Sequence, residues 1–316
     1  MRGARSGPQV FAVPVKGEKT GKEGYGMAFY ELRNDEVSIG IDSRGAELKS
    51  LKKLSTGAEY MWCGDAEYWA RTSPILFPFV GGLRDKVYRT KGETYPMTQH
   101  GFARDMEFEL LEERGDEIWF VLNSSEETLK KFPYEFVLKL GYRIAGSRVE
   151  VLWRVENPGD ETLPFAIGGH PAFNCPMEEG AKRSECFVDF NVPEVVSSRV
   201  GESGLVTGCM DVFRLNEGRL PITDNLFDHD ALVIENSQTD TVALCGRDGS
   251  RYLTVTMEAP LFGVWSPSGK TAPFVCIEPW YGRCDAEGFE GTLEEREWEN
   301  LIGPGEVFRA SYVIEV

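Results

Sequence analysis

Basic residues are scarce in this sequence, and long apolar runs are absent from it. Its 316 residues include 34 Lys and Arg against 51 Asp and Glu, which gives a formal charge of −17. A nucleic-acid partner needs a concentrated basic face, and no basic run of that kind is present. No stretch approaches the roughly 18 apolar residues of a membrane-spanning helix. We therefore expect neither a nucleic-acid nor a membrane partner.

Paired cysteines and a secretion signal are also missing. The seven cysteines are irregularly spaced without a C-x-x-C pair, which argues against a disulfide framework and against a Cys-rich zinc site. The N-terminal residues lack the apolar run of about 7 to 15 residues that export requires. We expect a cytoplasmic protein with reduced thiols, a monomer or weak homodimer. Residues 1–25 are expected to form a loosely ordered extension, and residues 26–316 a single domain.

Strand patterns dominate what is present. Only SSEETLKKF (124–132) is typical of a helix, with a Ser cap followed by acidic and then basic residues. Strands separated by Gly, Asn, Asp and Pro clusters, without alternating helices, predict an all-β fold, a large antiparallel β-sandwich. The segments with alternating or wholly apolar residues are 36–42, 117–123, 136–144, 148–157, 231–236, 241–246, 252–258, 274–279 and 308–316.

Two of the three histidines lie among glycines and prolines. His100 precedes a glycine in QHGFARD (99–105), and His170 lies in GGHPAF (168–173). Both positions indicate a turn at a strand end, where a side chain is held rigidly yet stays open to a ligand. The alternative is a histidine that only caps a turn.

Glu278 is the acidic residue that we consider beside these two histidines. In CIEPWYGRCD (276–285) it follows an apolar strand, and a carboxylate among apolar neighbours is costly unless it is paired or used. Strand alternation puts Cys276 and Glu278 on one face. If that face lines a cleft, the pKa of Glu278 is shifted to suit proton transfer. A solvent-exposed glutamate at a strand end is the alternative.

Further candidates for binding are an arginine and several aromatic residues. Arg71 precedes an apolar run in RTSPILFPFVGG (71–82), and its planar guanidinium suits vicinal hydroxyls or a carboxylate. A structural ion pair is the alternative. Trp69, Phe79, Trp265 and Trp280 offer flat faces for a sugar ring, although most aromatics in a sandwich are core.

A metal centre is not expected. His100, His170 and Glu278 have the composition of a site with two histidines and one carboxylate. No H-x-H or H-x-x-x-H spacing places two ligands on one element. We therefore expect neither a metal nor a cofactor.

Six segments together resemble the aldose 1-epimerase (galactose mutarotase-like) superfamily, in its LacX-like branch. The resemblance covers about residues 28–316 and implies a β-supersandwich fold. The segments that carry it are ELRNDEVSIGIDSRGAELKSL (31–51), WARTSPILFPFVGGL (69–83), YPMTQHGFARDMEFEL (95–110), GGHPAFNCP (168–176), LFDHDALVIEN (226–236) and APFVCIEPWYGRCD (272–285).

The resemblance implies an acid–base pair. His170 matches the general acid that protonates the ring oxygen, Glu278 matches the base for the anomeric hydroxyl, and His100 matches a histidine that hydrogen-bonds the sugar. Reference pKa values of about 4.3 and 6.5 then predict a bell-shaped pH profile. We expect the neighbouring carboxylate to raise the pKa of the histidine further.

The resemblance also implies substrate-binding residues. Arg71 matches an arginine that holds hydroxyls or a ring substituent. A family aspartate falls on Asp228 or Asp230, of which Asp230 is favoured because it abuts the strand. Gln99 and Trp280 complete the predicted sugar site. GGHPAF stands where galactose mutarotases have an Asn-His-Ser/Thr segment, so the resemblance leaves the sugar open.

The activity implied is that of an aldose 1-epimerase that interconverts the anomers of a free or phosphorylated hexose by opening the ring. A hexose-6-phosphate 1-epimerase would add a basic pocket, for which Arg71, Arg84, Arg104 and Arg283 are candidates. A non-catalytic carbohydrate-binding or sensing protein would bind without exchange. A glycoside hydrolase needs two carboxylates, and only Glu278 stands out.

Overall fold

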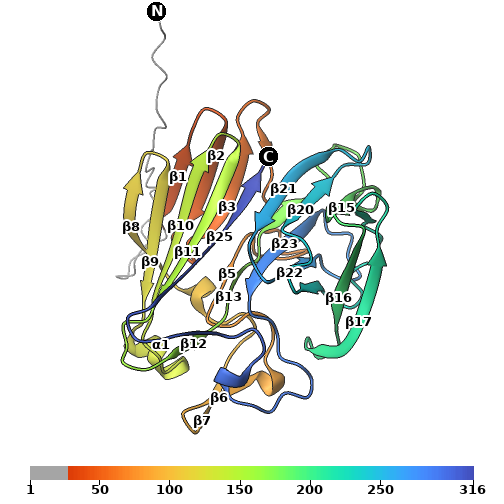
Figure 1. Cartoon of the computed structure of the whole chain (residues 1–316). Coiled ribbons are helices and arrows are strands. Elements are labelled where there is room, and N and C mark those ends of the chain that lie inside the picture. Colours follow the sequence, from red (N-terminus) through yellow and green to blue (C-terminus); the bar gives the residue numbers. More distant parts are fainter. Residues whose placement is uncertain (1–27) are drawn as a thin grey trace, which may run out of the picture.

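The computed structural model describes residues 28–316, and strands supply nearly all of their regular structure (Figure 1). All strands that pair within its sheets are antiparallel. The predicted all-β class and antiparallel sandwich are therefore confirmed. The predicted extension of residues 1–25 lies outside the described residues.

The largest sheet has nine strands in the order β18-β15-β20-β21-β25-β11-β10-β9-β8. Along β10 and β11 buried residues alternate with less buried ones, as a sheet with one face on the core requires. The strand bounds are β8 (Glu109–Arg114), β9 (Glu117–Asn123), β10 (Val137–Ala145), β11 (Arg148–Glu156), β15 (Phe187–Asp189), β18 (Arg219–Pro221), β20 (Thr241–Cys245), β21 (Arg251–Met257) and β25 (Val307–Glu315).

A second sheet of eight strands follows the order β17-β16-β19-β22-β23-β13-β5, with β14 also paired to β23. Its central strand, β23, is buried from Phe274 to Trp280 because neighbours cover both of its faces. The strand bounds are β5 (Ile75–Leu76), β13 (Ile167–Gly169), β14 (Ala172–Asn174), β16 (Glu194–Val200), β17 (Val206–Arg214), β19 (Leu232–Glu235), β22 (Leu261–Trp265) and β23 (Phe274–Tyr281).

The remaining strands form one four-stranded sheet, β1-β2-β3-β4, and two two-stranded sheets, β6-β7 and β12-β24. Their bounds are β1 (Phe29–Arg33), β2 (Val37–Asp42), β3 (Glu47–Lys53), β4 (Ala58–Glu59), β6 (Val87–Thr90), β7 (Glu93–Pro96), β12 (Leu163–Phe165) and β24 (Asn300–Ile302).

Helices are short, as the sequence predicts. In α1 (Glu126–Lys131), the Ser125 hydroxyl accepts a hydrogen bond from the Thr128 N–H, and the Thr128 hydroxyl accepts one from the Ser125 N–H. The single-turn 3₁₀ helices are η1 (Arg84–Lys86), η2 (Ala103–Asp105), η3 (Arg183–Glu185) and η4 (Leu293–Glu295). Among the described residues, no helix has the length and apolar content to cross a membrane.

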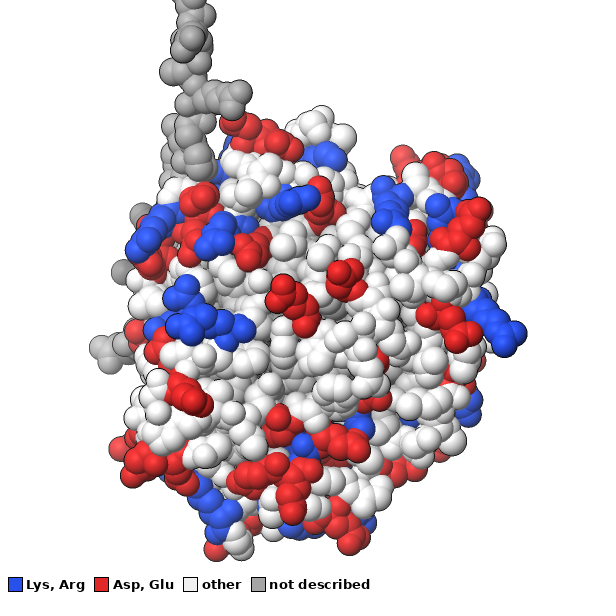
Figure 2. Space-filling view, in the orientation of Figure 1, with Lys and Arg blue, Asp and Glu red and all other residues white. Residues whose placement is uncertain are grey.

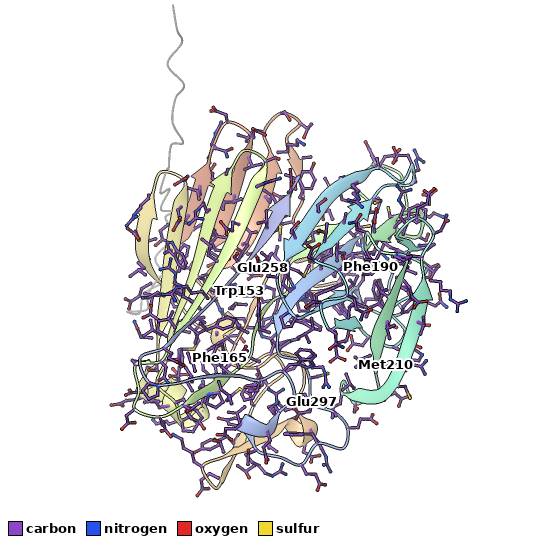
Figure 3. All side chains as sticks on the ribbon, in the orientation of Figure 1. Trp153, Phe165, Phe190, Met210, Glu258 and Glu297 are labelled. Atoms are coloured by element: carbon purple, nitrogen blue, oxygen red, sulfur yellow. The ribbon has the colours of Figure 1, made fainter. Side chains whose placement is uncertain are left out.

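The core lies between the sheets. Trp153 of β11 and Phe165 of β12 point into the interior in Figure 3, and both are buried. On the face shown in Figure 2, acidic and basic side chains are interspersed, without an extended basic patch. The fold thus encloses β23 and its neighbours, and leaves the sheet edges, β8 and β17, at the margins.

Candidate active site

Glu278 is presented by the central strand of the eight-stranded sheet. It lies opposite Gly263 of β22, and 1% of it is exposed. A Cβ on Gly263 would meet the Trp280 ring at 2.4 Å, so only glycine lets that indole cross the neighbouring strand. Cys276 and Glu278 lie on one face with their ligand atoms within 4.8 Å, which confirms the predicted alternation.

His170 is placed by the turn between β13 and β14. A Cβ on Gly168, two residues before His170, would lie 2.6 Å from the Trp280 ring, so glycine at this position permits close packing. The imidazole stacks on Trp69, with ring centroids 4.6 Å apart at 28°, and meets Trp265 edge-on at 5.4 Å. His170 is therefore held between two indoles with 7% of its surface exposed.

The turn that carries Trp69 is fixed from outside the sheet. Lys270 Nζ donates to the carbonyl oxygens of Glu67 at 2.6 Å and Tyr68 at 3.4 Å. The indole of Trp62 donates to the Trp69 carbonyl at 2.9 Å. These contacts position the Trp69 ring against the imidazole.

His100 is locked as one tautomer. Its backbone has a φ of 69°, and a Cβ on the next residue, Gly101, would lie 2.3 Å from the Phe77 carbonyl. The Gly81 N–H donates to Nδ1 of His100 at 3.1 Å. Because Nδ1 accepts, the proton of the neutral ring sits on Nε2, which can donate to a ligand oxygen.

The three side chains converge. Nε2 of His170 lies 3.4 Å from Oε2 of Glu278, and the His100 and His170 ring centroids are 5.6 Å apart. In the described part of the chain, neither Oε2 of Glu278 nor Nδ1 of His170 makes a hydrogen bond. Buried polar atoms are nearly always paired, so these two exceptions call for an explanation such as a catalytic role, a water or an ion.

Burial sets the protonation of this pair. It raises the pKa of Glu278 well above 4.5, with a further contribution from Asp230. It lowers the pKa of His170 from 6.5 to about 3, and the charges of Arg104 and Arg71 act in the same direction. The expectation that the carboxylate raises the pKa of His170 is therefore wrong, because burial disfavours the imidazolium and the raised pKa of Glu278 keeps this neighbouring carboxyl uncharged.

A cavity of about 310 Å³ receives these groups. Six of the eight predicted site residues line it, namely Glu278, His170, His100, Asp230, Trp280 and Gln99. The full lining is Trp69, Val80, Gly81, Gln99, His100, Arg104, His170, Val200, Gly204, Asp230, Ala231, Val233, Trp265, Glu278, Trp280 and Cys284.

The other two predicted residues lie elsewhere. Arg71 does not line the cavity, because its Nη2 donates to Oδ1 of Asp105 at 2.9 Å. Its charge still lowers the pKa of both cavity histidines. Asp228 lines a neighbouring hollow, while Asp230 borders both hollows.

Arg104 is the polar residue whose position the sequence did not indicate. It was assigned only to a phosphate pocket, yet it lines the cavity and donates from Nη2 to the Gln99 carbonyl at 2.8 Å. Burial, with the charge of Arg71, lowers its pKa to about 10. Its place four residues after His100 in QHGFARD was the available signal. The apolar residues of the cavity floor, which include Val80 and Val233, gave no such signal in the sequence.

The group best able to hold a metal differs from the one considered in the sequence. In the described residues, His170, Cys276 and Glu278 bring one ligand atom each within 4.8 Å of the others. Burial raises the pKa of the Cys276 thiol well above 9, which keeps it protonated. A metal would have to displace that proton and the pair's own proton.

Comparison with known proteins adds an independent result. The family model described as Aldose 1-epimerase matches residues 28–312. The chromosomal protein LacX of Lactococcus lactis subsp. lactis is 32% identical over 298 residues, which cover 90% of this chain and 98% of that protein.

Two solved structures share the fold closely. A galactose mutarotase related enzyme from Lactobacillus acidophilus has a TM-score of 0.86 and 33% identity, covering 91% of this chain and 96% of that one. A galactose mutarotase-like protein from Lactobacillus casei ATCC 334 has a TM-score of 0.83 and 32% identity, covering 92% and 99%.

Proposed function

Because this chain belongs to the aldose 1-epimerase family, we propose that it interconverts the α and β anomers of a hexose. Glu278 acts as base and His170 as acid. The observation that carries the proposal is their convergence: the two groups lie 3.4 Å apart on one cavity, with unpaired buried atoms. Anomeric exchange requires one base and one acid on the same sugar, and no cofactor.

The bond changes balance without outside reactants. Glu278 takes the proton of the C1 hydroxyl, whose O–H electrons become the second bond of the aldehyde. The bond between C1 and the ring oxygen breaks, and the ring oxygen keeps its electron pair and receives the proton of His170. Rotation about the C1–C2 bond presents the other aldehyde face, and closure reverses both transfers.

One proton shared by the pair is enough for this cycle. Ring opening starts from a carboxylate and an imidazolium and ends with a carboxylic acid and a neutral imidazole. The shifted pKa values of Glu278 and His170 favour the neutral form in the empty cavity. Sugar hydroxyls that hydrogen-bond the carboxylate favour the charged form, so binding prepares the pair to react.

The remaining lining residues supply orientation. The Nε2 proton of His100 is free to donate to a sugar oxygen, and the Asp230 carboxyl accepts from ring hydroxyls. Trp280 offers an apolar face to the ring, and Gln99 and Arg104 lie on the polar wall. Holding the sugar in one pose contributes through proximity as much as through proton transfer.

A free hexose fits this cavity better than a phosphorylated one. Of the four arginines considered for a phosphate, only Arg104 lines it. Arg84 donates to Glu290 at 3.0 Å, Arg71 to Asp105 at 2.9 Å and Arg283 to Glu235 at 2.6 Å. Three guanidinium groups are therefore already committed to carboxylates.

An NMR measurement of anomeric exchange over free and phosphorylated hexoses tests the proposal. We expect the protein to accelerate exchange of a free hexose, with and without a metal chelator. Glu258→Gln serves as a control, because Glu258, labelled in Figure 3, is exposed on the chain after β21 and does not line the cavity. Binding without accelerated exchange would assign a sensing role, and preference for the phosphorylated sugar would assign a phosphate-specific enzyme.

A further inference from the structure

Arg183 is a buried arginine that has no carboxylate partner among the residues that the structure describes. It is the first residue of η3, and 6% of it is exposed. The two other arginines that are buried to this degree, Arg283 and Arg296, each pair with carboxylates. A buried charge is costly unless hydrogen bonds replace its water. The hydrogen-bond partners of Arg183 therefore show what this guanidinium holds together.

The acceptors of Arg183 belong to the connection between β22 and β23, two strands that pair side by side (Figure 1). Nη1 donates to the Ala272 carbonyl at 3.1 Å and to the Ser266 hydroxyl, and Nη2 donates to the Lys270 carbonyl at 3.1 Å. The Ser266 hydroxyl in turn donates to the carbonyl of Phe274, the first residue of β23, at 2.9 Å. One guanidinium therefore fixes the whole connection.

This connection leads to both indoles that cover His170. Trp265, the last residue of β22, meets the imidazole edge-on at 5.4 Å. Lys270 Nζ donates to two backbone carbonyls of the turn that carries Trp69, whose ring stacks on the imidazole at 4.6 Å. The two indoles also contact each other, with ring centroids 5.6 Å apart. Both of them thus depend on the segment that Arg183 holds.

Arg183 also contacts the turn before β19. Its Cζ lies 5.8 Å from the centroid of the Phe227 ring, within the range of a cation–π contact. The Phe227 carbonyl accepts a hydrogen bond from the Asp230 N–H at 3.1 Å. Arg183 does not line the cavity, yet it is linked through these segments to three residues that do, namely Trp69, Trp265 and Asp230.

We propose that Arg183 is a positioning residue: it holds the β22–β23 connection so that two indoles enclose the imidazole of His170. This inference rests on the proposed function, because that function makes His170 the acid. The enclosure itself can be measured without any sugar. Burial keeps this ring neutral in the empty cavity, and water admitted by a loosened connection would favour the imidazolium.

The charged and titratable groups that face His170 are not bound to Arg183. They are Glu278, Cys276, His100, Arg104 and Arg71. In the described chain none of them hydrogen-bonds the Arg183 guanidinium. A substitution of Arg183 therefore leaves these neighbours present, and a change in the pKa of His170 reports the enclosure.

A titration of His170 followed by NMR is the test. The sequence has three histidines, so the imidazole signals are few, and the signal missing from His170→Asn is that of His170. In the wild type we expect no titration of this ring between about pH 5 and 8, because burial lowers its pKa to about 3. In Arg183→Met we expect its pKa to rise to about 5 to 6.5.

The kinetics of Arg183→Met add a second measurement. We expect kcat for a free hexose to fall by about tenfold while KM stays within about twofold, because the acid is affected more than sugar binding. Arg183→Lys keeps the charge but not the planar fork of donors, so it should lie between Arg183→Met and the wild type in both measurements.

Arg296→Met is the matched control for the loss of a buried guanidinium. Arg296 contacts Asp285 and Glu299 and neither of the two indoles. We expect this variant to lower the free energy of unfolding at least as much as Arg183→Met does. The pKa of His170 should nevertheless stay below about 5 in Arg296→Met.

Lys270→Met decides the question if Arg183→Met does not fold. The Lys270 side chain is exposed, so its loss frees the turn of Trp69 without opening the core. We expect the pKa of His170 to rise by less than in Arg183→Met, yet to above about 4.5. Lys131→Met is the control, because Lys131 pairs with Glu127 on α1 and should leave that pKa unchanged.

The outcomes separate this inference from the proposed function. An unchanged pKa of His170 in Lys270→Met and in folded Arg183→Met would overturn the inference, as would an equal rise in Arg296→Met. A raised pKa in these variants of a protein that accelerates exchange of no sugar would overturn the proposed function and leave the enclosure of the imidazole by Arg183 standing.

Discussion

Buried carboxyl groups occur in two regions of this protein, and the two regions differ in the charged partners of these groups. In the candidate active-site cavity, the ion-pair partner of Glu278 among the described residues is His170, with Nε2 3.4 Å from Oε2. In the arginine cluster, which we define as Arg283, Arg296, Glu235, Asp285 and Glu299, every carboxyl contacts a guanidinium. Both regions are almost fully buried.

The hydrogen bonds show the difference. Glu235 accepts from Arg283 Nε at 2.6 Å and from the Trp298 indole at 2.9 Å. Asp285 accepts from Arg296 Nε at 2.7 Å. Even so, burial raises the pKa of Glu299 to about 8. A raised pKa is therefore found in both regions. Glu278 differs because its ion-pair partner is an imidazole instead of a guanidinium and because it lines a cavity, where a group can exchange a proton with a ligand.

Glu278→Gln removes the buried carboxyl of the first region, and we expect it to have the largest effect on the exchange rate. Without a base, exchange should slow by about 10²- to 10⁴-fold. Burial raises the pKa of Glu278 above its unfolded value, so the folded state retains a proton and loses stability as pH rises from 4.5 to the raised pKa. The amide removes that cost, so Tm at pH 7 should not fall. Near-wild-type exchange, with Glu258→Gln as reference, would refute the role of the base.

Arg296→Met tests the second region by stability. Removal of one partner leaves Asp285 and Glu299 buried without their cation, which typically costs about 3 to 5 kcal/mol. Denaturant unfolding measures the loss. Arg148→Met is the matched control, because the exposed Arg148–Glu315 pair at 3.1 Å should contribute less than about 1 kcal/mol. Similar losses in both variants would show that burial does not distinguish the two pairs.

The pH dependence of kcat/KM sharpens the comparison. Below the His170 pKa of about 3 the pair holds two protons and lacks a base. Above the raised pKa of Glu278 it has lost its proton and lacks an acid. We therefore expect a bell-shaped pH profile that is broader than the profile that the ordinary pKa values of the two groups would give. Its acid limb should not lie near pH 6.5. An acid limb centred there would show that the imidazole titrates as if exposed.

Trp69→Ala is expected to have the smallest of these effects. Loss of the stacked indole admits water to His170, so the acid limb of the kcat/KM profile should move upward toward 6.5. The rate at its optimum should fall by about tenfold. Trp69→Phe keeps an aromatic face and should restore most of both. An unmoved acid limb in Trp69→Ala would leave the indole only a packing role.

Local pattern was sufficient for much of the fold and for the placement of Cys276 and Glu278 on one face of a strand. The strand predicted at 117–123 is β9, and the Ser-capped helix is α1. Alternation in β23 placed Cys276 and Glu278 on one face. These features depend on near neighbours in the chain, where periodicity and capping chemistry act directly.

Features that depend on residues far away in the chain could not be predicted from the sequence pattern. Arg71 is turned to Asp105, 34 residues away, and no spacing rule reports such a pair. β13 and β14 are three residues long and pair with β23, and β5 is two residues long and pairs with β13. The lowered pKa of His170 follows from burial, which depends on the indoles of Trp69 and Trp265 closing over it.

The central claim is that Glu278 and His170 act as one unit that passes protons through the sugar. Anomeric exchange measured by NMR for Glu278→Gln, His170→Asn and the double variant tests it most directly. Groups that act as a unit are strongly non-additive, so the double variant should be no more than about twofold slower than the slower single variant. Losses that multiply in the double variant, or a single variant near the wild-type rate, would contradict the claim.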